Sequence, residues 1–426
     1  MTLSPGHFHA ALVHKQMVPG VHPRVHVYAP LDGDLLAHLT RIAGFNSRPD
    51  TPTAWELDVR AGGDFLCRFL QEQPGNTVVI AGRNRPKIDL ILAALSNGLH
   101  VLADKPWVID AADLPKLEEA LQQADLRDLV AWDMMTERHE VTTALQRELL
   151  RDPDVFGVPL AGTPDEPGLV LESVHYLKKT VAGTPLIRPA WWFDTVEAGP
   201  ALADVGTHLA DLALWLLFPD RAVDHNRGAE VLDASAWPTP LDRQEFAAVT
   251  GLPDFPPGLP NVSGDRLLYA GNGTAMVRLR GVHVRLTALW DYEAQPGCGD
   301  THEAVARGTV SRVEVRPDGG QPELSVVAAD PGRHAEVMAA VERRCNEWQG
   351  MFPGVAARDL GDRVRVEVPD HLRVGHEAHF AAMVGEFARH FRNPRQVPAC
   401  EGVNLLTKYF LTTRAIEIAR VKQVRP

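Results

Sequence analysis

The sequence predicts an α/β protein in which a doubly wound parallel sheet is followed by an α+β domain with a large, mainly antiparallel sheet. The first 110 residues alternate strand and helix signals, and residues 77–81 form an apolar run typical of a buried parallel strand. From residue 266 onward, strands with alternating polar and apolar residues recur, as in an antiparallel sheet covered on one face. We place one domain in residues 1–135 and the other in residues 136–426.

Composition excludes several classes of function. The chain has 426 residues and a net charge of −12, which argues against nucleic acids and anionic membranes as partners. It has no apolar run of about 18 residues and no signal-peptide pattern, so we expect a cytoplasmic protein. The four cysteines form no CxxC pair and indicate free thiols. The 18 histidines show no metal-ligand spacing, so we expect no metal site.

The first strand, residues 1–3, is short for a central position. It leads into Ser4-Pro5-Gly6-His7-Phe8-His9 and a helix to Lys15, where a dinucleotide-binding sheet would carry GxGxxG. Only Gly6 remains of that pattern, although a helix N-terminus still offers backbone N–H groups to a phosphate. The alternative is an ordinary strand-to-helix turn.

Acidic residues follow the second predicted strand, residues 24–29. Asp32 and Asp34 would disfavour the 2′-phosphate of NADP, so NAD is the favoured cofactor and NADP the less favoured one. The next segment, 44–63, is rich in Pro, Thr and Gly and is interpreted as a surface loop with one helical turn.

The following unit is the clearest in the chain. Strand 77–81 leads through a loop with Asn84 to a helix over 88–97, and strand 100–103 ends in Asp104-Lys105-Pro106. Ligands of open α/β sheets bind at such carboxyl ends, and the proline restricts the backbone that carries Lys105. The alternative for Lys105 is a solvated loop lysine.

A helix predicted within residues 199–218 carries a row of polar residues. Asp204, His208 and Asp211 are spaced i, i+4 and i+7, so a helix aligns them on one face. An imidazole held between two carboxylates suits proton transfer near neutral pH. The alternative is a capped helix start with a histidine at the edge of the core.

Three motifs in this order resemble those of the Gfo/Idh/MocA family of nicotinamide-dependent oxidoreductases. They are Ala81-Gly82-Arg83-Asn84, then the segment 100–106 (HVLADKP), then the segment 204–208 (DVGTH). The chain departs from the family in its glycine turn, in Asp104, where the family has Glu, and in Lys87, where the family has His. The resemblance implies a Rossmann-like domain followed by an open-faced sheet that joins a partner copy, and hence a homo-oligomer.

The resemblance also implies roles for single residues. Lys105 would touch substrate and nicotinamide, and Asp204 and His208 would supply substrate binding and the general acid/base. The cofactor-binding set would be Gly6, His7, Phe8, His9, Asn84, Asp104, Lys105 and Pro106.

Further substrate contacts are expected in the second domain. Strand 169–179 is expected to carry His175 and Lys178 toward one region, and the faces of Trp191 and Trp192 suit a sugar ring. The alternative is that one of these tryptophans lies in the core. Asp211 is a substrate-binding candidate that would orient His208 or tie the helix to the sheet.

Other segments have weaker patterns. Glu137 and Arg138 either lie near a cleft or form a helix-start ion pair, and residues 300–303 are expected to line the cleft. Asp133 is expected near the cleft. Residues 220–260 are interpreted as an irregular excursion. Further elements are expected as strands at 275–279, 282–290 and 308–315, and as helices at 379–391 and 405–419.

These patterns predict an NAD(P)-dependent dehydrogenase or reductase that transfers a hydride between a nicotinamide and a hydroxyl-bearing carbon of a sugar, cyclitol or related carbohydrate. One alternative is a glycosidase or epimerase that recycles tightly bound NAD. Another is a non-catalytic protein that binds a nucleotide or sugar.

Overall fold

The structure is a computed structural model that describes residues 1–181, 184–295, 299–318 and 320–424. Its contacts divide the chain into two compact units, which are described separately. The first unit comprises Met1–Thr136, Val196–Gly199 and Gly375–Tyr409, and the second comprises Glu137–Thr195, Pro200–Val374 and Phe410–Pro426. The chain therefore passes between the units at several points, whereas the sequence suggested one boundary at 135/136.

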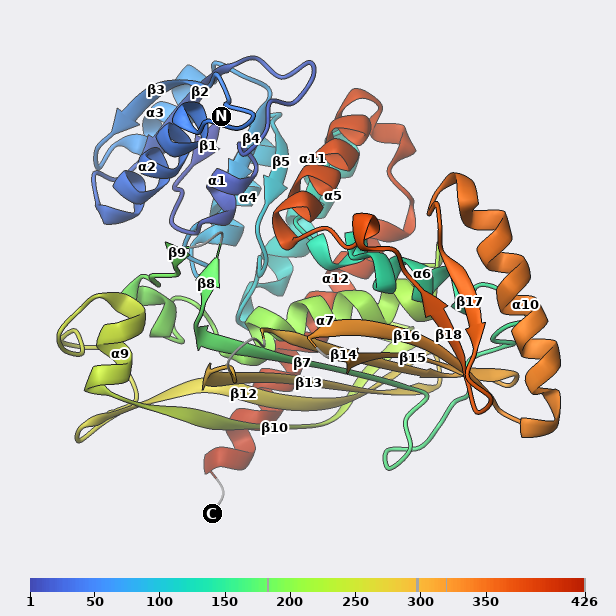
Figure 1. The fold of residues 1–426 in the computed structure, drawn as a ribbon. Coiled ribbons are helices and arrows are strands. Elements are labelled where there is room, and N and C mark those ends of the chain that lie inside the picture. The colour runs from blue at the N-terminus through green and yellow to red at the C-terminus, as the bar shows by residue number, and fades with distance from the viewer. Residues whose placement is uncertain (182–183, 296–298, 319, 425–426) are drawn as a thin grey trace. The chain divides into compact units, whose positions relative to one another are not determined.

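The first unit contains a six-stranded parallel sheet in the order β3-β2-β1-β4-β5-β6 (Figure 1). This order reverses between β1 and β4, and ligands of open α/β sheets bind at such a reversal point. The doubly wound parallel sheet predicted from the sequence is confirmed. The strands are β1 (Thr2–Leu3), β2 (Arg24–Ala29), β3 (Glu56–Ala61), β4 (Thr77–Ile80), β5 (His100–Ala103) and β6 (Ala131–Asp133).

Helices cover both faces of this sheet, because successive strand side chains point in opposite directions. Leu3, Tyr28 and Ile80 pack on one face with α3, α4, α5 and the start of α12. Val27 and Val79 belong to the other face, which α1, α2 and α11 cover. The helices are α1 (His9–Leu12), α2 (Gly33–Ser47), α3 (Phe65–Glu72), α4 (Lys87–Ser96), α5 (Leu114–Leu126), α11 (His376–Arg392) and α12 (Cys400–Val424).

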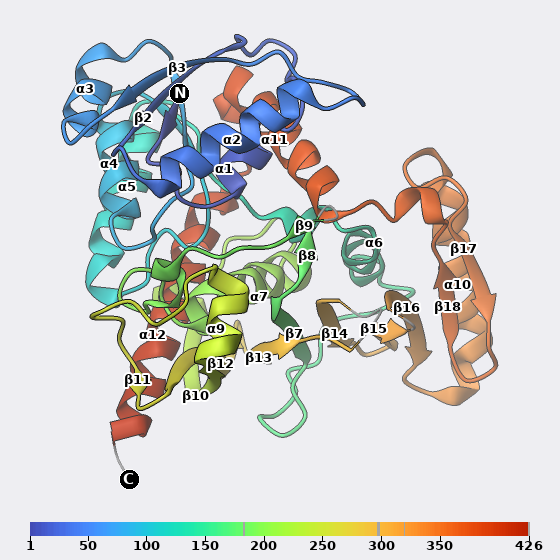
Figure 2. The same ribbon diagram turned by 60° about the vertical axis from the view of Figure 1, so that its left-hand side comes forward.

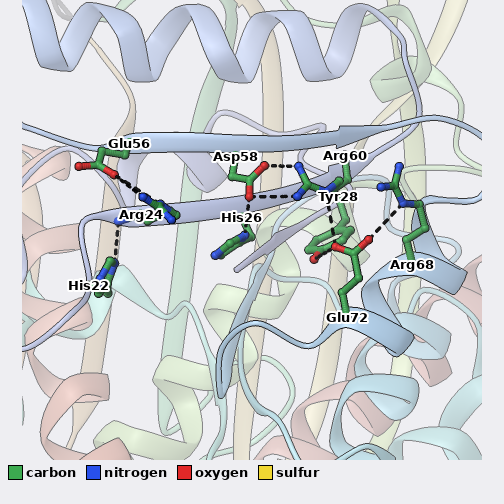
Figure 3. A network of polar contacts seen from close by, with 9 residues as sticks. All are labelled: His22, Arg24, His26, Tyr28, Glu56, Asp58, Arg60, Arg68 and Glu72. Carbon is green, nitrogen blue, oxygen red and sulfur yellow. Dashed lines mark hydrogen bonds and ion pairs between the residues drawn. The ribbon is translucent and has the colours of Figure 1, made fainter.

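The prediction that residues 44–63 form a surface loop with one helical turn is wrong for residues 56–61, which form strand β3. Helix α2 continues to Ser47, and β3 pairs in parallel with β2 at the edge of the sheet. On one face of this strand Glu56, Asp58 and Arg60 are bound in a polar network (Figure 3), whereas Leu57 and Val59 pack against the core. In this network His26 Nδ1 lies 3.2 Å from Asp58 Oδ2, Arg60 pairs with Asp58, and the Tyr28 hydroxyl donates to Glu72 at 2.8 Å.

The second unit is built on a ten-stranded sheet in the order β10-β12-β13-β7-β14-β15-β16-β18-β17, with β11 beside β12. Strands β13 and β7 run parallel and the other pairs described in this sheet run antiparallel, which confirms the mainly antiparallel prediction. The strands are β7 (Leu169–Lys178), β10 (Ala229–Asp242), β11 (Val262–Ser263), β12 (Arg266–Leu279), β13 (Val282–Glu293), β14 (Thr301–Arg307), β15 (Ser311–Asp318), β16 (Gln321–Ala328), β17 (Ala356–Asp359) and β18 (Val364–Glu367). A separate small hairpin joins β8 (Thr180–Val181) and β9 (Thr184–Pro185).

Helix α7 (Ala201–Leu217) lies on the face of β12, β13 and β7, and α6 (Val141–Leu150) lies beside it over β15 and β16 (Figure 2). The approach of α7 is close, because a Cβ at Gly273 would lie 2.6 Å from Leu202 Cγ. Alternate residues of β12 and β13, such as Met276 and Leu289, point to the opposite face and are half-buried. The remaining helices are α8 (His225–Gly228), α9 (Arg243–Thr250) and α10 (His334–Glu347).

The prediction that residues 220–260 are irregular is also wrong. This segment contains the 14-residue strand β10 and the capped helix α9. Strand β10 forms one edge of the sheet, and its register shifts between Trp237 and Thr239, on either side of Pro238. An edge strand tolerates prolines such as Pro238 and Pro240, which argue against a strand in sequence reading.

Two predictions from composition can be compared with the structure. Cys67, Cys345 and Cys400 are free thiols as expected, and Cys298 lies outside the described residues. Among the described helices, none has the length and apolar character required to cross a membrane.

Candidate functional site

The turn after β1 lies at the reversal point of the first sheet, but its backbone is bonded to the protein itself. Gly6 N and His7 N both donate to Ala81 O, at 3.0 and 2.9 Å. Ser4 adopts φ 47°, in the left-handed region that glycine favours, where the first glycine of GxGxxG would stand. A Cβ at Gly82 would lie 2.2 Å from Ser4 O, so Gly82 allows the two loops to touch. The turn therefore differs from an open phosphate-binding loop.

Of the two acids that follow β2, one is structural and the other lies at the turn. Asp32 caps α2 by accepting from Leu35 N at 3.0 Å. Asp34 Oδ2 lies 3.1 Å from the position of a Cβ on Gly6 and 3.6 Å from Arg83 Nε. Asp34 is therefore the carboxylate placed where a ribose could contact this edge.

Asn84 makes bonds within the first unit. Its Nδ2 donates to Ala198 O at 2.7 Å, and its Oδ1 accepts from Lys87 Nζ at 2.7 Å. The Lys87 side chain is fully buried. Both ends of the Asn84 amide thus hold the segment Val196–Gly199 and the start of α4.

Asp104 follows β5 and lies between two histidines of the first turn. Its Oδ1 is 2.8 Å from His9 Nδ1, and its Oδ2 is 3.0 Å from His7 Nδ1. Phe8 packs against both imidazoles, with ring centroids 4.5 Å from each. Burial lowers the pKa of His9 to about 4 despite the nearby carboxylate, so the ring is neutral at pH 7. Burial alone would raise the pKa of Asp104, but His9 and His7 hold it well below its usual range.

Lys105 is 9% exposed, and its peptide bond to Pro106 is cis. Two residues after Lys105, Trp107 is buried and stacks on Tyr409 with ring centroids 6.4 Å apart.

Asp133, which was expected near the cleft, is buried and bonded to α12. Lys408 Nζ lies 2.9 Å from its Oδ2, and the Tyr409 hydroxyl donates to the same atom at 2.7 Å.

In the second unit, α7 carries the predicted row of polar residues. Asp204 and His208 are half-buried, whereas Asp211 is 3% exposed. The guanidinium of Arg138 donates to both oxygens of Asp211, at 2.7 and 2.8 Å. Asp211 therefore ties α7 to the segment before α6, and its burial does not suit substrate binding.

The Arg188 side chain lies against a packed group of aromatic residues. The Arg188 guanidinium lies 4.6 Å from the ring centre of Trp192 and 4.9 Å from that of Trp290. Trp192 is 7% exposed and packs on Tyr269, so it belongs to the core, while Trp191 is half-buried. The alternative that one of the two tryptophans is a core residue therefore holds for Trp192.

The charge of Arg188 interacts with the carboxylates of Asp204 and Asp300. Burial lowers the pKa of Arg188, whereas Tyr269 and then the charges of Asp204 and Asp300 act in the opposite direction. Its guanidinium donates to Leu177 O and Tyr176 O, both at 3.1 Å. Arg188 thus places a fixed positive charge near Asp204 within the second unit.

His175 and Lys178 do not reach one region, which corrects the prediction. They are three residues apart on β7, so their side chains leave opposite faces of the sheet. Lys178 is exposed and pairs with Glu293 at 2.9 Å. His175 instead lies against Trp290, with ring centroids 4.8 Å apart.

His175 is the centre of a hydrogen-bonded chain that the sequence did not reveal. Its Nδ1 lies 3.1 Å from Asp300 Oδ2, and its Nε2 lies 3.0 Å from Ser173 Oγ. Burial would raise the pKa of Asp300, but His175 and Lys179 hold it well below its usual range. Because the carboxylate fixes the imidazole, His175 can pass a proton at Nε2. The sequence spacing predicts that Ser173 and His175 share one face of a strand. It does not predict the contact with Asp300, which lies 125 residues from His175.

The family model described as "Putative oxidoreductase C terminal domain" matches residues 145–420. A search of curated proteins found no match. A crystal structure of a "putative oxidoreductase" from Parabacteroides merdae is 40% identical, with a TM-score of 0.95, and the match covers 99% of this chain and 97% of that one.

More distant structures share the fold. A levoglucosan dehydrogenase in complex with NADH and levoglucosan has a TM-score of 0.62 at 14% identity, covering 99% of this chain and 97% of that one. A 3-ketoreductase from Actinomadura kijaniata, in complex with NADP and TDP-benzene, has a TM-score of 0.56 at 15% identity, covering 98% and 96%. The extent of the model match, together with the Parabacteroides relative, shows that this chain belongs to the family described as "Putative oxidoreductase C terminal domain".

Proposed function

We propose that this protein is a nicotinamide-dependent oxidoreductase that acts on a hydroxyl-bearing carbon of a sugar, cyclitol or related carbohydrate. The observation that carries the proposal is the position of Lys105 at the carboxyl end of β5 in a sheet ordered 3-2-1-4-5-6. The family membership, the dehydrogenase with NADH and levoglucosan and the ketoreductase with NADP support it.

Residues of the first unit suit both ends of a dinucleotide, the adenosine ribose and the nicotinamide. The Asp34 carboxylate beside Gly6 suits a ribose hydroxyl and favours NAD over NADP. Lys105, after β5, suits the nicotinamide end. When bound, the nicotinamide supplies a carbon that accepts or returns a hydride. The diphosphate has less support from the backbone, because Gly6 N and His7 N are bonded to Ala81 O.

The roles of the protein groups follow from their chemistry. His208 takes the proton of the substrate hydroxyl, and Asp204 favours the charged form that results. Lys105 stabilises the negative charge that develops on the oxygen. Arg188 places a positive charge near Asp204. This charge offsets part of the negative charge of Asp204 and so limits how far Asp204 favours the charged form of His208.

The test is a His208→Asn variant assayed with NAD and a panel of sugars and cyclitols. General acid–base help is worth about 10² to 10⁴ in rate, so kcat should fall by that factor while the Kd for NAD stays constant. His371→Asn, at an exposed position, is the control and should match the wild type. Wild-type turnover by His208→Asn would refute the role of His208.

A second candidate is a glycosidase or epimerase in which the cofactor is recycled. The hydrogen-bonded chain Ser173–His175–Asp300 favours it, because redox-neutral elimination needs a second base besides His208. That base removes the C–H proton that a transient ketone makes acidic, and the electron pair expels the leaving group, which takes up a proton. In a glycosidase water then adds to the C=C bond that results, and the hydride returns to the ketone carbon. This candidate predicts NAD that copurifies with the protein and turnover of glycosides without added cofactor. A requirement for added NAD in stoichiometric amounts would exclude it.

We also propose that the sheet face opposite α7 pairs with a second copy of the chain. This face carries half-buried residues of mixed polarity, including Thr274, Met276, Thr287 and Leu289. Such a surface is compatible with an interface between copies.

A further inference from the structure

The strongest unexplained feature of the molecule is a group of three residues, His7, His9 and Asp104, here named the histidine–aspartate cluster. One ligand atom from each lies within 4.8 Å of the others, and all three residues belong to the first unit. His9 and Asp104 are buried, and His7 is partly exposed and provides a route to solvent. The two histidines are close in sequence, but residue spacing could not show that Asp104 joins them, because it lies 95 residues from His9.

Hydrogen bonding does not fully account for the cluster. His9 Nδ1 forms a bond of normal geometry with Asp104 at 2.8 Å. His7 Nδ1 lies 3.0 Å from the other carboxylate oxygen and is shielded from solvent, yet it makes no hydrogen bond of acceptable geometry among the described residues. A ligand that binds the His7 Nδ1 atom would therefore be favoured, because a buried polar atom is stabilised by a well-aligned partner.

We propose that His7, His9 and Asp104 bind a divalent transition-metal ion. Ligand atoms held at about 2.0–2.2 Å from one ion lie about 3 Å from each other, close to the separations of 2.8 and 3.0 Å in the cluster. Two imidazoles and a carboxylate favour Zn²⁺, Mn²⁺, Fe²⁺ or Co²⁺ over Mg²⁺ and Ca²⁺, which prefer oxygen ligands.

Aromatic rings of α11 pack against the cluster. Phe380 of α11 packs on His9 with ring centroids 4.6 Å apart, and His376 of the same helix brings another imidazole to 5.8 Å. With neutral imidazoles, one carboxylate and a divalent ion, the cluster has a net charge of +1. Such a centre attracts anions.

The ion would have a specific use if the proposed function holds. The cluster lies on the turn after β1, where a dinucleotide would place its diphosphate. Gly6 N and His7 N are bonded to Ala81 O and do not serve that diphosphate. The ion would supply the positive charge that the glycine turn lacks. This last step rests on the proposed function, whereas the metal site itself does not.

The direct test is metal binding by the full-length protein. After chelator treatment and dialysis, Zn²⁺, Mn²⁺ and Co²⁺ are titrated by calorimetry, bound metal is measured by mass spectrometry, and Co²⁺ gives a visible spectrum that reports nitrogen ligands. We expect one ion per chain in the wild type. His7→Asn and Asp104→Asn should bind the ion at least tenfold more weakly.

The control is His22→Asn, an exposed histidine of the same unit that should bind like the wild type. His7 is partly exposed, so its variant should fold, and circular dichroism checks this. Absence of bound ion in the wild type would overturn the proposal, since the cluster would then be two imidazoles packed against a carboxylate with no ligand between them. Equal affinity in His7→Asn and wild type would overturn it as well.

A second measurement separates the metal site from the cofactor. NAD is titrated into the metal-loaded and the metal-free protein, and we expect at least tenfold tighter binding with metal. Equal affinities would contradict the role at the diphosphate. Absence of NAD binding in both forms would instead contradict the proposed function, while the metal titration would still decide the site.

Discussion

The pairing of Asp211 with Arg138 shows how the polar row on α7 is divided. Asp204 and His208 are half-buried, but Asp211 is bonded through both oxygens to a guanidinium that also lies 6.0 Å from the ring centre of Trp215. The helical spacing predicted that the three residues share a face. It could not reveal Arg138, because this partner lies 73 residues away in sequence.

Breaking this buried pair should be costly. Removing one partner of a buried ion pair leaves the other charge without compensation, which costs about 3 kcal/mol or more. We expect Asp211→Asn to lower the free energy of unfolding in urea by roughly that amount. The control is Asp220→Asn, because Asp220 is exposed and its pair with Arg147 should contribute about 1 kcal/mol or less. Equal losses in the two variants would contradict the structural role of Asp211.

At the level of elements, two edge strands were misread as irregular segments. Strands β2 and β5 were predicted with the bounds that the structure has, because their apolar residues are buried in the sheet. Strands β3 and β10 were missed, because one carries charged residues bound in a polar network and the other carries prolines. The candidate site was predictable only where its residues are close in sequence. The contacts of Asp104 and Asp300 join distant segments and therefore could not be read from spacing.

The contact between the loops after β1 and β4 predicts a large effect of a single methyl group. A Cβ at Gly82 would lie 2.2 Å from Ser4 O, so Gly82→Ala must separate the two loops and weaken the bonds to Ala81 O. We expect a loss of about 2 kcal/mol or more, measured by urea denaturation.

The matched control for this change is Gly44→Ala in α2, where a Cβ meets nothing within 4 Å. Alanine favours a helix over glycine by about 1 kcal/mol, so this variant should be more stable than the wild type. If Gly82→Ala also retained full stability, the close contact of the two loops would be refuted.

For the whole molecule, buried histidines predict sensitivity to acid. Burial lowers the pKa of His9 and His14 to about 4 and that of His38 to about 3. The unfolded chain protonates these rings near pH 6.5, whereas the folded chain does so only at lower pH. Between those values the unfolded state binds more protons, so stability falls as the pH drops below about 6.5.

This loss should be visible as a falling urea midpoint between pH 8 and pH 5. His38 is 3% exposed, and neither of its ring nitrogens has a hydrogen-bond partner among the described residues. His38→Leu should therefore reduce the slope of stability against pH and raise the stability at pH 5. A midpoint independent of pH in the wild type would show that these histidines are protonated equally in both states.

The proposed contact between copies through the open sheet face concerns the assembly. Analytical ultracentrifugation at micromolar concentration should give a mass of at least two chains. Leu289→Arg places a charge on the half-buried face of β13 and should shift the protein toward the monomer. A monomeric wild type would exclude an interface on this face at that concentration.

The most direct test of the proposed function is the binding of nicotinamide nucleotides to the purified protein. Ligands released on denaturation are identified by mass spectrometry, and NAD and NADP are titrated by calorimetry in the presence of Zn²⁺ or Mn²⁺. We predict one saturable site per chain that binds NAD more tightly than NADP, because the Asp34 carboxylate lies beside Gly6. A protein that releases no nucleotide and binds neither NAD nor NADP would contradict its assignment as a nicotinamide-dependent oxidoreductase.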